Sequence, residues 1–134
     1  MADKLMRTMV VISFLLVIAF FSGCGANETQ TATAENGRQI TLQPGEVMTV
    51  TLNSNMTTGF SWQVLKIDNA ILIQEGDSEY KQSQNSEGLV GTGGTETFHF
   101  KAVGTGETSL ELGYMRPWED VPPIETYKVQ VIVQ

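Results

Sequence analysis

Apolar and polar residues alternate along five stretches of this chain, with the period of two that is typical of a β-strand with one buried face. The apolar positions are Met48, Val50 and Leu52; Phe60, Trp62 and Val64; Phe98, Phe100 and Ala102; Leu110, Leu112 and Tyr114; and Tyr127, Val129, Val131 and Val133. A further apolar run, Ala70 to Ile73, is too short to distinguish a strand from one turn of helix.

Turn signals separate these stretches, and no long helical pattern appears. They lie at residues 44–45, 53–59, 75–77, 91–94, 104–106 and 117–123. Short alternating strands with this punctuation predict an all-β protein, an immunoglobulin-like β-sandwich of about seven or eight strands. Trp62 falls on an inward-facing position, so we expect it in the core.

The N-terminus has the parts of a secretory signal. Lys4 and Arg7 precede an apolar run at residues 9–21, which is shorter than the ~20 residues that a membrane-spanning helix needs. Its Gly-Cys ending at Cys24 resembles a bacterial lipobox, in which the cysteine is acylated after cleavage; a plain signal peptide is the alternative. We expect an exported protein, lipid-anchored to the bacterial cell envelope at the outer membrane or the outer face of the plasma membrane.

The chain has room for one folded domain. Residues 1–23 are the expected signal peptide, and residues 24–37, which lack large apolar side chains, are the expected flexible tether. Residues 38–134 then form the domain, close to the ~100 residues of an immunoglobulin-like sandwich. Cys24 is the only cysteine, so no intramolecular disulfide can form. We expect a monomer.

Composition gives no support to several classes of function. The formal net charge of −7 argues against binding to a phosphate backbone, so we expect no nucleic-acid partner. His99 is the only histidine and alternates with two phenylalanines, which places it on the solvent side of its strand. A lone solvent-side histidine supports neither a Ser-His-Asp triad nor a metal site. We expect no enzyme activity, no cofactor and no metal.

Three short clusters between the predicted strands carry the most information. They are Asn55-Met56-Thr57-Thr58-Gly59-Phe60, Gly91-Thr92-Gly93-Gly94 and Arg116-Pro117-Trp118-Glu119. Loops on a rigid scaffold often carry function, because the strands fix their positions while the side chains remain free to meet a partner.

With their flanking strands, these clusters resemble the chagasin-type inhibitors of papain-like cysteine proteases, over roughly residues 45–133. The family's first loop reads Asn-Pro-Thr-Thr-Gly, then an aromatic residue and a Trp two further on. Its second loop reads Gly-x-Gly-Gly, followed by Thr and a Phe-x-Phe strand. Its third reads Arg-Pro-Trp-Glu after a Leu-x-Leu-x-Tyr strand. Each motif alone is weak, but three in the right order form a specific signal.

The resemblance implies a non-enzymatic, reversible and competitive inhibitor whose three loops enter or flank the cleft of a papain-like cysteine protease. The implied contact residues are Asn55, Met56, Thr57, Thr58, Gly59, Phe60, Gly91, Thr92, Gly93, Gly94, Arg116, Pro117 and Trp118. It also implies that Thr57 and Thr58 approach the catalytic cysteine and histidine of the protease, while Asn55 and Gly59 hold the shape of the first loop.

Two features leave alternatives open. Met56 stands where the family has proline, and losing that restraint on φ should weaken binding by about 0.4 to 1 kcal/mol. Trp118 either meets a partner, as its residue type favours, or folds back to cap the core. Because sandwiches host many functions, a surface-anchored envelope or adhesion module is the competing hypothesis.

Overall fold

The computed structural model describes residues 31–84 and 92–134 of the 134-residue chain. These ranges contain nine strands and one short 3₁₀ helix. The elements are β1 (Thr31–Thr33), β2 (Gln39–Leu42), β3 (Val47–Ser54), η1 (Met56–Thr58), β4 (Ser61–Lys66), β5 (Leu72–Gln74), β6 (Glu79–Gln82), β7 (Gly94–Ala102), β8 (Gly106–Met115) and β9 (Glu125–Val133). None of the described segments is a helix long and apolar enough to cross a membrane.

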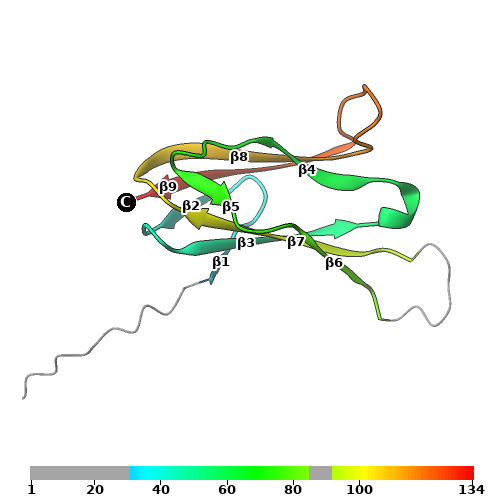
Figure 1. Cartoon of the computed structure of the whole chain (residues 1–134), viewed down its shortest axis with the longest axis horizontal. Helices are drawn as coiled ribbons and strands as arrows, with labels where there is room; N and C mark the ends of the chain where they lie inside the picture. The colour runs from blue at the N-terminus through cyan, green and yellow to red at the C-terminus, as the bar shows by residue number, and fades with distance from the viewer. Residues whose placement is uncertain (1–30, 85–91) are drawn as a thin grey trace, which may run out of the picture.

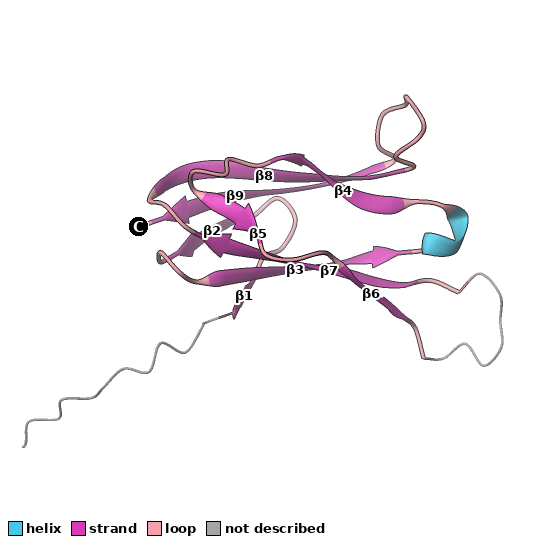
Figure 2. Cartoon of the chain, viewed as in Figure 1, coloured by secondary structure: helices cyan, strands magenta, loops and turns pink. Residues whose placement is uncertain are grey.

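The strands form two stacked sheets (Figures 1 and 2). One has the order β1-β3-β7-β5, with β6 also paired to β7, and the other has the order β2-β9-β8-β4. Two pairs are parallel, β1 with β3 and β2 with β9, and the remaining pairs are antiparallel. The predicted fold class, an all-β immunoglobulin-like sandwich, is confirmed; the strand count is slightly higher than predicted.

The core lies between the sheets and consists of the inward-facing positions that the alternation marked. Along β7, buried residues alternate with half-buried ones over its whole length. The largest fully buried side chains are Tyr127, Phe100, Leu42, Met48, Leu72, Leu110 and Leu112. Trp62 is 5% exposed, which confirms it as a core aromatic.

The expected tether at residues 24–37 is wrong in its second half. Thr31–Thr33 form β1, which pairs with the start of β3. Beyond it, Tyr127 Oη donates to the Ala34 carbonyl at 3.0 Å, and the Asn36 side chain accepts from Lys128 N at 2.9 Å. Most of these bonds use backbone groups, which a composition rich in Thr, Ala and Asn does not reveal. The paired region therefore begins before residue 38.

The ambiguous run Ala70 to Ile73 divides between a turn and a strand. Ile71 N and Leu72 N both donate to the Asp68 carbonyl, at 3.0 and 2.8 Å. The chain then enters β5, where Leu72 pairs with Ala102 of β7. The strand reading is confirmed from Leu72 onward.

Stability should fall at alkaline pH through Tyr127. Burial raises the pKa of Tyr127 from 10.0 to about 12, because the phenolate is less well solvated than in water. The folded state therefore holds the Tyr127 proton more tightly than the unfolded state does. The contribution of this difference to the free energy of unfolding is complete below pH 10 and is lost between pH 10 and 12. Urea unfolding across this range should show a shallower decline in Tyr127→Phe than in the wild type. Equal slopes in the two proteins would contradict the assignment.

Candidate functional site

Three loops emerge from the same end of the sandwich. The first loop, residues 55–60, joins β3 to β4; the second joins β6 to β7; and the third loop, residues 116–124, joins β8 to β9. The sheet register explains their proximity, because Ser54 pairs with Gly94 and Ser61 pairs with Met115. Figure 1 shows the first and third loops at the right-hand end of the molecule. The sequence-predicted clusters are thus brought together by strand pairing.

The first loop is a capped 3₁₀ turn. Asn55 Oδ1 accepts hydrogen bonds from Thr57 N at 3.3 Å and from Thr57 Oγ1 at 2.6 Å. Thr58 Oγ1 donates to the Asn55 carbonyl at 2.7 Å. Gly59 ends the turn in the left-handed region, with φ of 80°, which glycine adopts without strain. The two threonines therefore lie exposed at the tip in a shape fixed by the loop itself.

Met56 begins this turn in place of the family's proline. Its carbonyl accepts a hydrogen bond from Gly59 N at 3.1 Å, and its side chain is 48% exposed. The Asn55 cap and the Gly59 end restrain the turn that proline would otherwise stiffen. The loss of binding expected from Met56 stays a prediction.

The base of the first loop is held by aromatic residues of the core. Asn55 N donates to Tyr114 Oη at 2.8 Å, and Trp62 Nε1 donates to the Asn53 carbonyl at 2.9 Å. The Tyr114 ring lies between Phe60 and Trp62, with ring centroids 5.4 and 5.2 Å away. The chain entering the loop and the chain leaving it are therefore attached to the same aromatic cluster.

Glu96 is a supporting residue that the sequence reasoning missed. It is 3% exposed, and its carboxylate accepts from Trp62 N at 3.1 Å and from Ser78 Oγ at 2.8 Å. It thereby links β7 of one sheet to β4 of the other beside the first loop. The signal was present in the sequence, since Glu96 occupies an inward position of the alternation that Phe98 and Phe100 continue.

The third loop presents Trp118 to solvent. Its side chain is 70% exposed, so the alternative that it caps the core is wrong. A Cβ built on Gly59 would lie 2.7 Å from Trp118 Cη2, which shows that the edge of the indole rests against the first loop. Glu119 N donates to the Arg116 carbonyl at 3.1 Å and closes a turn around Pro117 and Trp118. The indole is thus displayed beside the first loop rather than withdrawn.

Arg116 forms an internal ion pair with Glu119. Arg116 Nη1 lies 3.1 Å from Glu119 Oε1. Its Nε also donates to the Thr58 carbonyl at 3.1 Å, so the side chain crosses from the third loop to the first. Pro117 lies exposed between Arg116 and Trp118.

The second loop is described only near its ends. Gly91 lies outside the described residues. Thr92 Oγ1 accepts from Gln82 Nε2 at 2.8 Å, and the Gly93 carbonyl accepts from Ser83 N at 3.1 Å. A hollow of about 410 Å³ is lined by residues of this loop base, such as Ser83 and Gly93, and by Asn55 of the first loop.

Gly94 differs from the expectation that it belongs to the contact surface. It is buried within β7, between Ser54 of β3 and Gln82 of β6. A Cβ at this position would lie 2.2 Å from the Lys81 carbonyl oxygen. Close packing of the strands, rather than access to a partner, therefore requires a glycine at position 94.

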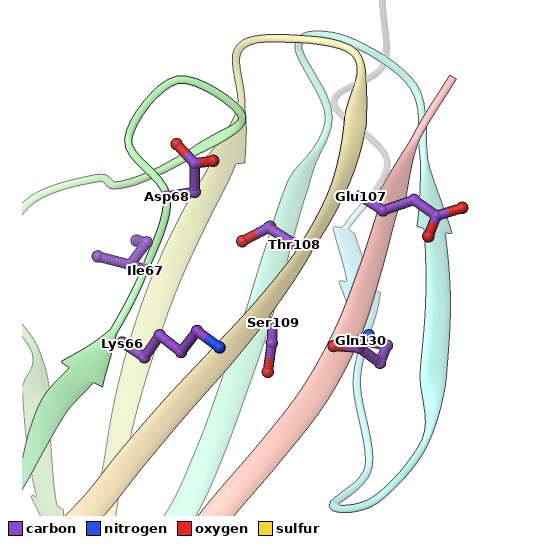
Figure 3. A pocket seen from close by; sticks show the side chains of 7 residues that line it. All are labelled: Lys66, Ile67, Asp68, Glu107, Thr108, Ser109 and Gln130. Atoms are coloured by element: carbon purple, nitrogen blue, oxygen red, sulfur yellow. The ribbon is translucent and has the colours of Figure 1, made fainter.

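A second hollow lies at the other end of the sandwich, and its lining residues do not form a catalytic triad. It measures about 400 Å³ and is lined by the polar or charged residues Lys66, Asp68, Glu107, Thr108, Ser109 and Gln130 together with Ile67 (Figure 3). Ser109 Oγ lies 3.4 Å from Glu111 Oε1, and no histidine is among the lining residues. His99 instead pairs with Thr49 Oγ1 at 3.1 Å, on another part of the surface.

The fold and the site together define a β-sandwich that presents a capped turn and an exposed tryptophan at one end. A model of the Chagasin family peptidase inhibitor I42 matches residues 41–131, and the chain belongs to this family. Chagasin of Trypanosoma cruzi is 36% identical over 89 residues, which cover 63% of this chain and 78% of chagasin.

Two solved structures share the fold. The crystal structure of EhICP2, a cysteine protease inhibitor from Entamoeba histolytica, has a TM-score of 0.68 at 21% identity and covers 78% of this chain and 95% of EhICP2. PbICP-C, solved in complex with falcipain-2, has a TM-score of 0.52 at 20% identity and covers 81% of this chain and 93% of PbICP-C. At these identities the likeness shows the sandwich alone.

Proposed function

We propose that this chain is a reversible, competitive inhibitor of papain-like cysteine proteases and that its loops block the active-site cleft of the protease. The observation that carries the proposal is Trp118, 70% exposed and resting against the capped first loop, in a chain of the chagasin family. The complex of PbICP-C with falcipain-2 supports the class of partner.

In this proposal each loop has a separate task. The exposed Thr57 and Thr58 approach the catalytic cysteine and histidine, and Trp118 flanks the cleft. The backbone near Thr92 and Gly93 makes the second-loop contact. No covalent bond to the protease forms or breaks, since inhibition requires only that the cleft be occupied.

Preformed loops explain how such a contact becomes tight. A standard interface buries about 1,600 Å², and its affinity depends on how much freedom the partners lose on binding. The bonds that Asn55 makes within the first loop, and the ion pair of Arg116 with Glu119, remove much of that freedom before binding. The first and third loops therefore need little rearrangement to meet the cleft.

Steady-state inhibition of papain and of a cathepsin L-type enzyme tests the function, with a serine protease as the control. The full chain, held in mild detergent, should raise the apparent KM of the cysteine proteases and leave the serine protease unaffected. No inhibition at micromolar concentration by protein with a sharp unfolding transition would overturn the proposal and favour the adhesion module.

Removing one hydroxyl should weaken inhibition by loosening the first loop. Tyr114→Phe takes away the acceptor for Asn55 N but keeps the aromatic cluster, so we expect a loss of about 1 kcal/mol, or roughly fivefold in the inhibition constant. Tyr80→Phe is the matched control, since the buried Tyr80 hydroxyl has no hydrogen-bond partner among the residues that the structure describes. Equal inhibition constants for the two variants would remove Tyr114 from the support of the loop.

We also propose that the protein is exported, acylated at Cys24 and held at the cell envelope, and that it acts as a monomer. The basic start, the short apolar run and the Gly-Cys ending of residues 1–24 support this proposal, although Cys24 lies outside the described residues. Mass spectrometry of the protein from a bacterial host should find a diacylglyceryl-modified N-terminal cysteine. Cys24→Ser should abolish the modification and release the protein from the membrane fraction.

A further inference from the structure

The side chain of Arg116 is engaged on three sides by its own protein. Its Nε donates to the Thr58 carbonyl at 3.1 Å, and its Nη1 lies 3.1 Å from Glu119 Oε1. Its Cζ lies 4.5 Å from the centroid of the Phe60 ring, the geometry of a cation–π contact. The side chain is 35% exposed. The guanidinium therefore connects the third loop to both halves of the first.

These contacts use two of the five N–H groups of the guanidinium and one of its faces. Arginine recognises carboxylates and backbone through its fork of N–H groups and through its flat face. Here one face lies on Phe60, and the Nε edge points to Thr58. The other N–H groups are compatible with a further bond, so the internal contacts define a positioning role that a direct contact with the protease would add to and not replace.

The Thr58 carbonyl is a sensitive place for such a bond. Thr58 is the last residue of the 3₁₀ turn, and Gly59 follows it with φ of 80°. The indole of Trp118 and the Nε of Arg116 both lie close to Gly59, 2.7 and 3.7 Å from the position that a Cβ would take there. The segment 58–59 is thus in contact with two side chains of the third loop, which fixes the direction in which the turn faces.

We propose that Arg116 is a positioning residue, which sets the conformation of Thr58 and Gly59 and joins the first and third loops into one rigid binding element. This inference rests on the proposed function for its effect on inhibition, but its structural content concerns the free protein. Charge alone is not enough for the role, because a lysine has no Nε donor and no planar face to lie on Phe60.

The first test is hydrogen exchange in the full chain, held in detergent without any protease. The amides of Thr58 and Gly59 donate within the turn, to the carbonyls of Asn55 and Met56. Arg116→Lys should speed their exchange by about tenfold, the scale of a lost hydrogen bond together with its ring contact. Arg38→Lys makes the same substitution at an exposed ion pair with Glu35 and should leave both amides unchanged. Unchanged exchange in Arg116→Lys would overturn the inference, whatever the inhibition.

The second test separates positioning from direct contact. Inhibition of papain should weaken about tenfold in Arg116→Lys, and to a similar extent in Phe60→Leu, which removes the ring beneath the guanidinium. The double variant should be little weaker than either single one, because both act through the same contact. Additive losses, or a loss of inhibition without faster exchange, would show that Arg116 binds the protease itself. A wild type that fails to inhibit would refute the proposed function while leaving the exchange result to decide the inference.

Discussion

Trp118→Ala should weaken inhibition of papain-like proteases by at least about 2 kcal/mol, or roughly thirtyfold in the inhibition constant. Tryptophan is the residue type most often found where truncation is costly at an interface, and this one is 70% exposed at the end of the sandwich. Competition assays against a small peptide substrate measure the change directly. Because the indole contacts Gly59 and lies outside the core, the melting temperature should stay close to that of the wild type.

A second truncation separates this effect from the general loss of an exposed apolar surface. Val103 is 44% exposed in the turn between β7 and β8. This turn lies at the opposite end of those two strands from the second and third loops. Val103→Ala should leave the inhibition constant unchanged. If Trp118→Ala also inhibits as the wild type does, the third loop does not contact the protease through its tryptophan.

The strands that could be predicted from the sequence are those that build the core. β7 offers five inward positions in nine residues, which is enough for a period of two to be recognised. β1, β2 and β6 have three or four residues each, too few for a period to emerge. β6 has only Tyr80 as an apolar residue, and β1 is held by pairing with β3. Short edge strands defined by backbone bonds leave little trace in a sequence.

The exposed loop positions could be predicted from the sequence, but their internal partners could not. Loop motifs mark Thr57, Thr58 and Trp118, which the structure places on the surface, and their contact with a protease stays a prediction. The contact of Arg116 with Thr58 spans 58 positions in the chain and depends on the register that pairs Ser61 with Met115. Tyr114 was read from its alternation as a core residue, and its hydroxyl bond to Asn55 follows from that same register.

Gly94 shows that one motif can combine two physical roles. The sequence offered Gly91-Thr92-Gly93-Gly94 as a single contact loop. In the structure, Gly93 lies in the connection before β7, whereas Gly94 is the first residue of that strand and is buried. Thr92 and Gly93 belong to the loop, and Gly94 belongs to the sheet.

Gly94→Ala should therefore destabilise the fold. The added methyl group would lie 2.2 Å from the Lys81 carbonyl oxygen and 2.9 Å from Gln82 Cα, and both of these are backbone atoms of β6. Such atoms cannot rotate away as a side chain can, so β6 must separate from β7 at the base of the second loop. Overpacking of this kind costs about 2 to 3 kcal/mol, which lowers the melting temperature of a domain of this size by roughly 10 to 20 °C.

Gly93→Ala is the matched control, because within the described part of the chain its Cβ would meet only the Ser54 carbonyl oxygen, at an ordinary 3.5 Å. This variant should melt close to the wild type, yet inhibit less well if the second loop approaches the protease through its backbone. Calorimetry and inhibition assays on the two variants then assign each glycine to its role. Equal melting temperatures for Gly94→Ala and Gly93→Ala would show that β6 can move to accommodate a methyl group at position 94. Gly94 would then again be a candidate contact residue. A stable but weakly inhibiting Gly93→Ala would place the boundary between scaffold and binding surface at the peptide bond that joins the two glycines.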